Sequence, residues 1–123
     1  MSFRITKDFA FSAAHHLEGL HPGHQCARLH GHNYRVRVCL DAPLLDAHGF
    51  VFDYGDLAPF GRWLDATLDH QDLNAVLPKI QPSAENLARE LAQMVTGLCS
   101  IPETIRVSVG VSETPKTWAW WLP

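Results

Sequence analysis

The sequence predicts an α+β fold in which a four-stranded antiparallel sheet carries two helices on one face. Alternating apolar residues, typical of strands, occur in two segments near the start of the chain and in two near its end. Two segments with helical spacing lie between them. The order strand, strand, helix, helix, strand, strand is typical of a sheet with its helices packed on one side. We expect one domain over residues 1–123, long enough to bury a core.

The first two strands are predicted from side-chain alternation. In residues 3–13 the odd-numbered side chains are apolar and would share one face. In residues 33–41 the apolar face is even-numbered, and arginines occupy positions on the other face. Residues 18–31 contain three glycines, a proline and three histidines, which indicates a loop between the strands.

Two helices are predicted in the middle of the chain. Residues 56–68 show apolar positions at helical spacing, with Asp56 as the expected N-cap and Pro59 in the first turn, where proline is tolerated. A second helix begins after Ser83, its expected N-cap, and Gly97 marks its expected end.

The last two strands are predicted in residues 105–112 and 118–122. The first of them alternates cleanly, with Ile105, Val107, Val109 and Val111 directed inward.

Composition excludes several classes of function. The net charge of -3 gives no reason to expect nucleic-acid binding or attraction to an anionic membrane. No apolar run approaches the roughly 20 residues that span a bilayer. The three cysteines are widely spaced and odd in number, which favours reduced thiols and a cytoplasmic location over a disulfide framework.

Histidine is unusually frequent, with eight residues, and seven of them precede residue 50. His30 and His32 are two positions apart in an extended segment, so their side chains point the same way and could converge on one metal ion. A single histidine at a loop end is more often a solvated polar group. The pair before a strand, with His15 and His16 at the end of the neighbouring strand, favours a metal site.

Strand parity chooses between the two adjacent histidines. His15 continues the odd-numbered inward face of residues 3–13, whereas His16 would point outward. His15, His30 and His32 are therefore the predicted ligands of one zinc ion per chain. Three protein ligands leave a coordination position for water or substrate, which is the catalytic arrangement.

Three further positions are candidates for chemistry. Cys26 lies four residues before His30, and a thiol near a cation gains thiolate character. Asp69 and His70 are adjacent after the first helix and are either a helix-end cap and a surface group or a proton-relay pair. Glu113 continues the inward parity of residues 105–111, and an inward carboxylate needs a partner, for which a ligand would serve.

Five blocks of sequence resemble the 6-pyruvoyl-tetrahydropterin synthase superfamily. They are FSAAHHL at 11–17, GHQCARLHGHNY at 23–34, LDHQDLN at 68–74, PSAEN at 82–86 and SET at 112–114. The blocks occur in family order across nearly the whole chain. The match is closest to the bacterial branch, the 6-carboxy-5,6,7,8-tetrahydropterin synthases of the queuosine pathway, because Cys26 comes four residues before HGH.

The resemblance implies a function and a role for each candidate residue. The substrate would be 7,8-dihydroneopterin triphosphate, and the products would include acetaldehyde and triphosphate. The three histidines would bind zinc and Cys26 would be the catalytic base. Asp69 and His70 would relay protons, and Glu113 would hold the pterin ring. The family fold implies trimers whose sheets join into a barrel, and hexamers, with sites that borrow residues across subunits.

Alternatives and departures from the family pattern stay open. The alternatives are a 6-pyruvoyl product from the same substrate, a non-catalytic zinc-binding protein, and a cysteine hydrolase that uses Cys26 and His70. His16 occupies a position often held by a basic residue, and the chain ends in the tryptophan-rich WAWWLP. The triphosphate should meet a basic residue, for which Arg28, Lys79 and Lys116 are equal candidates.

Overall fold

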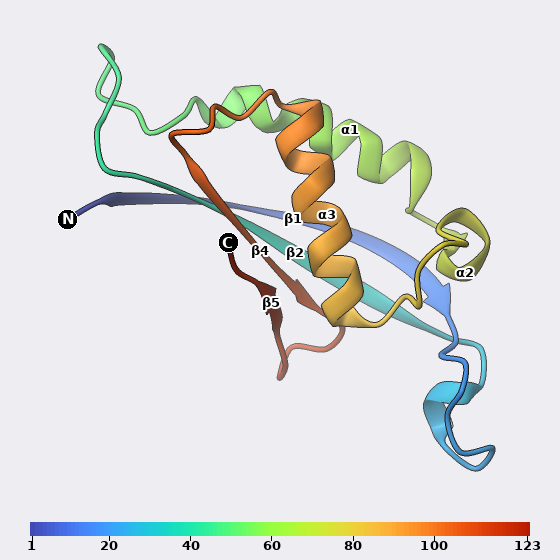
Figure 1. Ribbon diagram of the computed structural model, residues 1–123. Coiled ribbons are helices and arrows are strands. Elements are labelled where there is room, and N and C mark those ends of the chain that lie inside the picture. The colour runs from blue at the N-terminus through green and yellow to red at the C-terminus, as the bar shows by residue number, and fades with distance from the viewer.

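The computed structural model describes residues 1–123 and shows an α+β fold built on one five-stranded sheet (Figure 1). Two long antiparallel strands, β1 (Phe3–His15) and β2 (His30–Ala42), form its centre. They pair over their whole length, from Phe3 opposite Ala42 to His15 opposite His30. On the other side of β2 lie β4 (Arg106–Ser112) and then β5 (Ala119–Trp121), both antiparallel to their neighbours.

The prediction of four antiparallel strands is wrong, because a fifth strand makes the sheet mixed. The strand β3 (Gln71–Asp72) pairs in parallel with Ala13 and Ala14 of β1, and the strand order is β3-β1-β2-β4-β5. β3 has only two residues, both exposed, so it has no apolar alternation to reveal it. The predicted loop was also too long, since β2 begins at His30 rather than after residue 31.

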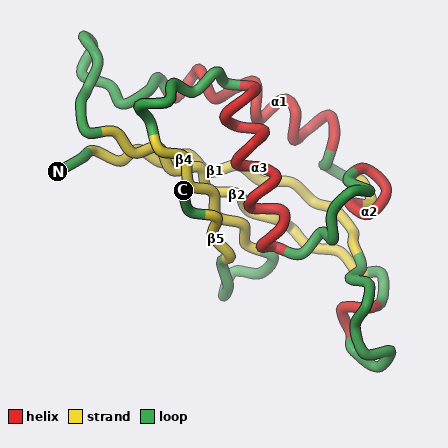
Figure 2. Tube along the Cα trace, in the orientation of Figure 1, coloured by secondary structure: helices red, strands yellow, loops and turns green.

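The helices α1 (Ala58–Thr67) and α3 (Ala84–Leu98) cover one face of the sheet, as predicted (Figure 2). The short helix α2 (Leu73–Val76) follows β3. Asp56 is not the cap of α1. A 3-10 turn, Tyr54–Leu57, precedes α1, and the Asp53 carboxylate caps this turn by accepting from the amide of Gly55 at 2.8 Å.

Helix α3 begins where its sequence predicts and ends slightly later. The Ser83 hydroxyl accepts from the amide of Asn86 at 3.2 Å, which confirms Ser83 as the N-cap. Gly97 lies inside the helix and does not stop it. The chain leaves the helix through Ser100, which has a positive φ of 52°.

The core lies between the helices and the inward face of the sheet, and its strand residues follow the predicted parity. Phe11 and Ala13 of β1 are buried, as are Tyr34, Val36, Val38 and Leu40 of β2. From α3, the apolar stripe of Leu87, Leu91 and Val95 is fully buried against them.

The tryptophan-rich end of the chain packs on the open face of the sheet. The ring of Trp120 lies directly over Gly110 of β4, where an added Cβ would stand 2.6–2.9 Å from three ring atoms. Trp118 stacks on Trp120 with ring centroids 6.0 Å apart. The guanidinium of Arg37 lies 4.8 Å from the Trp118 ring and also pairs with Asp8 through two hydrogen bonds. Because Gly110 has no side chain, the Trp120 ring can approach this close.

We expect Gly110→Ala to destabilise the protein by about 1–3 kcal/mol, because the new methyl group would overlap the Trp120 ring. The matched control is Gly97→Ala in α3, where an added Cβ meets nothing within 4 Å. That change should stabilise the protein by up to about 1 kcal/mol. Urea denaturation of both variants measures the difference, and equal stability of the two would contradict the packing of Trp120 on Gly110.

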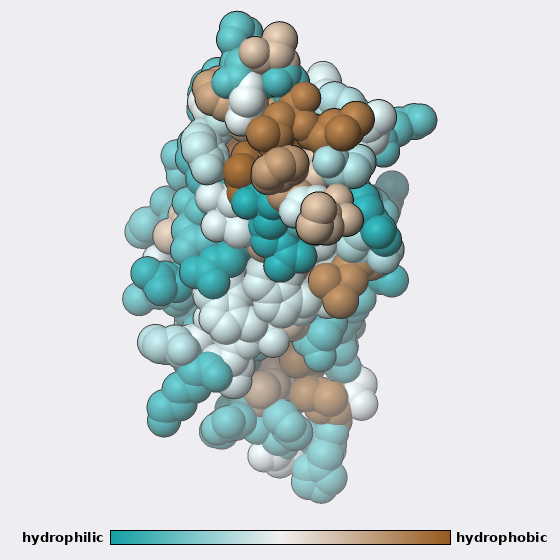
Figure 3. Space-filling model, turned by 90° about the vertical axis from the view of Figure 1, so that its left-hand side faces the viewer, coloured by the Kyte–Doolittle hydropathy of each residue, from teal (hydrophilic) through white to brown (hydrophobic).

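The two ends of the sheet differ in surface character. Exposed apolar side chains gather at the end that carries the N-terminus, namely Phe3, Leu44, Leu45, Phe50 and Tyr54 (Figure 3). At the opposite end, the segment between β1 and β2 projects beyond the sheet (Figure 1). His15 ends β1 and His30 begins β2, so both residues lie at the base of this segment. The chain contains no helix with the length and apolar character needed to cross a membrane.

Candidate metal centre

Strand pairing brings the three predicted ligands together. His15, the last residue of β1, lies directly opposite His30, the first residue of β2. His32 lies two positions along the same strand, so its side chain points to the same face. The ligand atoms of the three histidines all lie within 4.8 Å of one another. This group could hold a metal ion. His16 points elsewhere, with its Nε2 3.3 Å from Glu18.

Backbone carbonyls orient two of the imidazoles. Nδ1 of His15 lies 2.7 Å from the carbonyl oxygen of Pro82, and Nδ1 of His30 lies 2.7 Å from that of Arg28. A carbonyl only accepts, so both Nδ1 atoms carry the proton and both Nε2 atoms present a lone pair. These two Nε2 atoms face each other at 3.1 Å. Two lone pairs at that distance repel each other unless a proton or a metal ion lies between them.

The third imidazole, that of His32, supplies a nitrogen that has no hydrogen bond in the protein, although Oε2 of Glu113 lies 3.4 Å away. Nε2 of His32 is buried and forms no hydrogen bond. A buried polar atom without a partner is costly, and a metal ion would satisfy it. Three imidazole nitrogens are a donor set that suits zinc. The residues present therefore fit a zinc ion, by the orphaned nitrogen of His32 and by the orientation of the other two rings.

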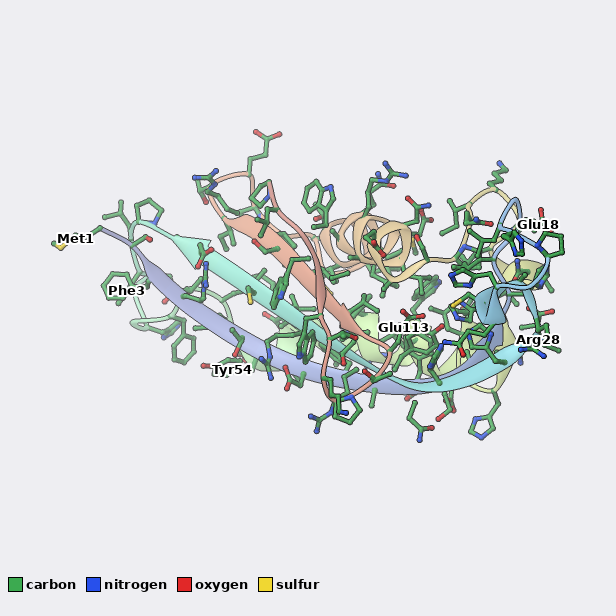
Figure 4. The ribbon with its side chains drawn as sticks, turned by 90° about the horizontal axis from the view of Figure 1, so that it is seen from below. Met1, Phe3, Glu18, Arg28, Tyr54 and Glu113 are labelled. Atoms are coloured by element: carbon green, nitrogen blue, oxygen red, sulfur yellow. The ribbon has the colours of Figure 1, made fainter.

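Glu113 completes the cluster from the end of β4, the strand that lies on the other side of β2 from β1. It directly follows β4, and its Oε2 lies 3.3 Å from Nε2 of His15 and 3.4 Å from Nε2 of His32. In Figure 4 its side chain lies toward the end of the molecule that carries Glu18 and Arg28, away from Met1 and Phe3. The inward direction that parity predicts for Glu113 is therefore the one observed.

Interactions within the cluster and burial shift the pKa values of its members. When His15 is protonated, its Nε2–H can donate to the Glu113 carboxylate, and this hydrogen bond holds the pKa of Glu113 below its usual value despite partial burial. Burial works against the charged form of His15, but its contacts with Glu113 and with the Pro82 carbonyl together raise the pKa of His15. Burial lowers the pKa of His32, so this imidazole favours the neutral form that binds metals.

Cys26 lies on the 3-10 turn Gln25–Ala27 in the segment that joins the two histidine-bearing strands. His24 caps this turn, because its Nδ1 accepts from the amide of Cys26 at 3.0 Å. The carbonyl oxygen of Cys26 accepts from the amide of Leu17 at 2.8 Å. The turn is thus tied to the chain two residues beyond His15, and the thiol is partly exposed.

Asp69 and His70 form a hydrogen-bonded pair, which is one of the two alternatives that their sequence left open. Nδ1 of His70 donates to Oδ2 of Asp69 at 2.9 Å, while Oδ1 of Asp69 accepts from the amide of Ser12 at 2.8 Å. The hydrogen bond from the Ser12 amide, and to a smaller extent the one from His70, keep the pKa of Asp69 below its usual value. His70 has a positive φ of 59°, and its side chain is 81% exposed. The carboxylate therefore orients an imidazole that is open to its surroundings.

Comparison with known proteins assigns nearly the whole chain to one family. Residues 4–122 match the family described as 6-pyruvoyl tetrahydropterin synthase. This chain belongs to that family. It is 31% identical to a 6-carboxy-5,6,7,8-tetrahydropterin synthase of Bacillus subtilis, over 99% of this chain and 86% of the relative. It is 34% identical to a probable 6-carboxy-5,6,7,8-tetrahydropterin synthase of Halobacterium salinarum, over 85% of this chain and 76% of that protein.

Solved structures agree with the family assignment. The 6-pyruvoyl tetrahydropterin synthase of Caenorhabditis elegans superposes with a TM-score of 0.85 and 25% identity, over 100% of this chain and 96% of that one. An uncharacterized Wolinella succinogenes protein superposes equally well, with a TM-score of 0.85, at 22% identity. Membership of the family makes this chain an enzyme of pterin chemistry.

Sequence reasoning missed the groups that support the cluster. The carbonyl of Pro82 orients His15, and no pattern of side chains in the sequence could predict that a backbone carbonyl accepts this hydrogen bond. Parity predicted that Tyr34 points inward but not that it lies beside the histidines, with its ring centroid 5.4 Å from that of His32. It is fully buried, and its hydroxyl has no hydrogen-bond partner. Asn74 and Gln81 bind the segment after β1. Asn74 stands in one of the family blocks, which was a signal for its importance but not for its role.

Proposed function

We propose that the protein is a zinc-dependent lyase that makes 6-carboxy-5,6,7,8-tetrahydropterin in queuosine biosynthesis. It would convert 7,8-dihydroneopterin triphosphate and water into this product, acetaldehyde and triphosphate. The observation that carries the proposal is the meeting of three histidine nitrogens and the Glu113 carboxylate at one end of the sheet. The names of the curated relatives support the 6-carboxy product.

The proposed roles follow from the chemistry of the side chains. His15, His30 and His32 would hold one zinc ion per chain. Bound there, zinc supplies a Lewis acid that stabilises negative charge on the side-chain oxygens of the substrate. Glu113 would accept the two parallel N–H donors on the edge of the pterin ring. Cys26 would take a proton from the substrate side chain, and the Asp69–His70 pair would move a proton as general acid and base.

The same proposal includes a homo-oligomer, a trimer or hexamer. β1 pairs with β3 only at Ala13 and Ala14, so the edge of β1 from Phe3 to Ser12 has no partner strand within the chain. The exposed apolar side chains of Figure 3 lie at the same end. An open edge beside an apolar surface favours pairing with another copy. The exposed position of His70 fits a site that neighbouring subunits share. A cytoplasmic location stays a prediction from the three free cysteines.

A product assay tests the proposed activity. Zinc-loaded protein is incubated with 7,8-dihydroneopterin triphosphate, and acetaldehyde and triphosphate are measured in the same sample. We expect equal amounts of both. Triphosphate without acetaldehyde would instead identify the 6-pyruvoyl reaction, and release of neither would identify a non-catalytic zinc-binding protein.

Glu113→Gln tests the role of the carboxylate. We expect KM for the pterin substrate to rise about tenfold to a hundredfold, because a charge-assisted hydrogen bond contributes about 1.5–3 kcal/mol. Zinc content should stay near one per chain. Glu103→Gln, at an exposed position between α3 and β4, is the matched control. A KM for Glu113→Gln equal to that of the control would show that Glu113 does not hold the substrate.

A further inference from the structure

The segment that follows β1 is held by two side-chain amides in place of a neighbouring strand. Oδ1 of Asn74 accepts from the amide of His16 at 2.9 Å, and its Nδ2 donates to the His16 carbonyl at 3.0 Å. Oε1 of Gln81 accepts from the amide of Glu18 at 2.9 Å, and its Nε2 donates to the Glu18 carbonyl at 2.8 Å. Each amide makes both hydrogen bonds that one residue of a paired strand would make. We call Asn74 and Gln81 the amide clamp.

The amide clamp continues the edge of the sheet where the backbone of β3 can no longer do so. β3 pairs with Ala13 and Ala14, and the chain then turns into α2, whose backbone bonds are internal. Residues two apart in an extended chain present their backbone groups to the same side. His16 and Glu18 therefore face the clamp, while Leu17 between them faces the other way and donates to the carbonyl of Cys26.

Gln81 also connects the amide clamp to the metal centre through the backbone of the next residue. Gln81 directly precedes Pro82, whose carbonyl orients the imidazole of His15. The carbonyl of Gln81 itself accepts from Nδ2 of Asn86 in α3 at 3.0 Å. The end of β1, the turn that carries Cys26 and the carbonyl that orients His15 are thus joined through one set of hydrogen bonds.

We propose that Asn74 and Gln81 are positioning residues for the metal centre. By holding the backbone on both sides of Leu17, they fix the His15 imidazole and the Cys26 turn relative to each other. The hydrogen bonds of the two side-chain amides all go to the backbone of His16 and Glu18 and none to the three histidine nitrogens. Groups that orient metal ligands from outside typically change metal affinity about 10–100-fold when they are altered. The inference rests on the proposed zinc site of His15, His30 and His32.

The test uses Asn74→Asp and Gln81→Glu in the full chain. Each variant keeps the accepting oxygen and replaces the donating NH2 by an oxygen, which faces the carbonyl of His16 or Glu18. We expect zinc affinity, measured by competition with a chromophoric chelator, to fall about tenfold in each. The added negative charge alone would raise the affinity for a cation, so a fall must come from the lost hydrogen bond. Gln93→Glu, an exposed change of the same chemistry on α3, should bind zinc like the wild type.

Hydrogen exchange supplies the second readout. Exchange should be faster at His16 in Asn74→Asp and at Glu18 in Gln81→Glu, because repulsion between the new carboxylate oxygen and the backbone carbonyl would open the pair that protects each amide. Faster exchange with zinc affinity unchanged in both variants would show that the clamp only tethers the loop, and would overturn the inference while leaving the proposed function intact. A wild-type chain that binds no zinc would overturn both. The two variants change separate residues, so Gln81→Glu decides the question if Asn74→Asp does not fold.

Discussion

His32→Ala is expected to abolish tight zinc binding and turnover while leaving the metal-free fold intact. Its Nε2 is buried without a hydrogen-bond partner, so the metal-free protein loses no hydrogen bond when the ring is removed. Two imidazoles would remain, which is fewer than the three protein ligands of catalytic zinc sites. A ligand that binds only the folded state stabilises it by an amount that grows with its concentration over Kd, about 2.7 kcal/mol at a hundredfold excess.

Thermal unfolding with and without zinc measures this effect. Zinc should raise the Tm of the wild type and leave that of His32→Ala unchanged. His48→Ala is the control, because His48 is an exposed residue whose ring lies 5.9 Å from that of Phe50 and outside the cluster. An equal rise of Tm in wild type and His32→Ala would place the zinc elsewhere.

Cys26→Ala should reduce kcat about 10²–10⁴-fold, the range that a general base contributes. The thiol is not one of the three clustered donors, so zinc content should stay near one per chain. This combination separates a lyase from a zinc-binding protein, in which Cys26 would have no role.

Cys99→Ala is the matched control for the loss of a thiol. Cys99 is buried beside the core, and burial raises the pKa of its thiol, so it is a packing residue rather than a base. The Cys99→Ala variant should keep full activity at temperatures below its Tm. Full activity of Cys26→Ala would contradict the proposed mechanism, and loss of zinc from Cys26→Ala would make the thiol a ligand.

Strand regularity explains why much of the site was predictable. A strand alternates its side chains strictly, so the parity of residues 3–13 directed His15 inward and left His16 outside. The same rule directed Glu113 toward the cluster from the end of β4. Both inferences needed only the local pattern and the assumption that the strand continues by one or two residues.

The features that escaped prediction depend on contacts between distant parts of the chain. β3 exists because Gln71 and Asp72 meet the end of β1, and two residues contain no periodic signal. Asn74 bonds to His16 across 58 positions of sequence. A polar side chain that replaces a strand partner looks like any other surface amide in a sequence. Asp53 rather than Asp56 caps the turn before α1. Both aspartates precede apolar helical residues, so the sequence alone could not choose between them, and the path of the backbone decides which one is the cap.

X-ray absorption at the zinc edge of the loaded wild-type protein tests the metal centre most directly. Three imidazole nitrogens near 2.0–2.1 Å, with one or two further oxygen or nitrogen neighbours, are the predicted zinc environment. A sulfur neighbour near 2.3 Å would contradict it, since it would make a cysteine a ligand in place of one of His15, His30 and His32.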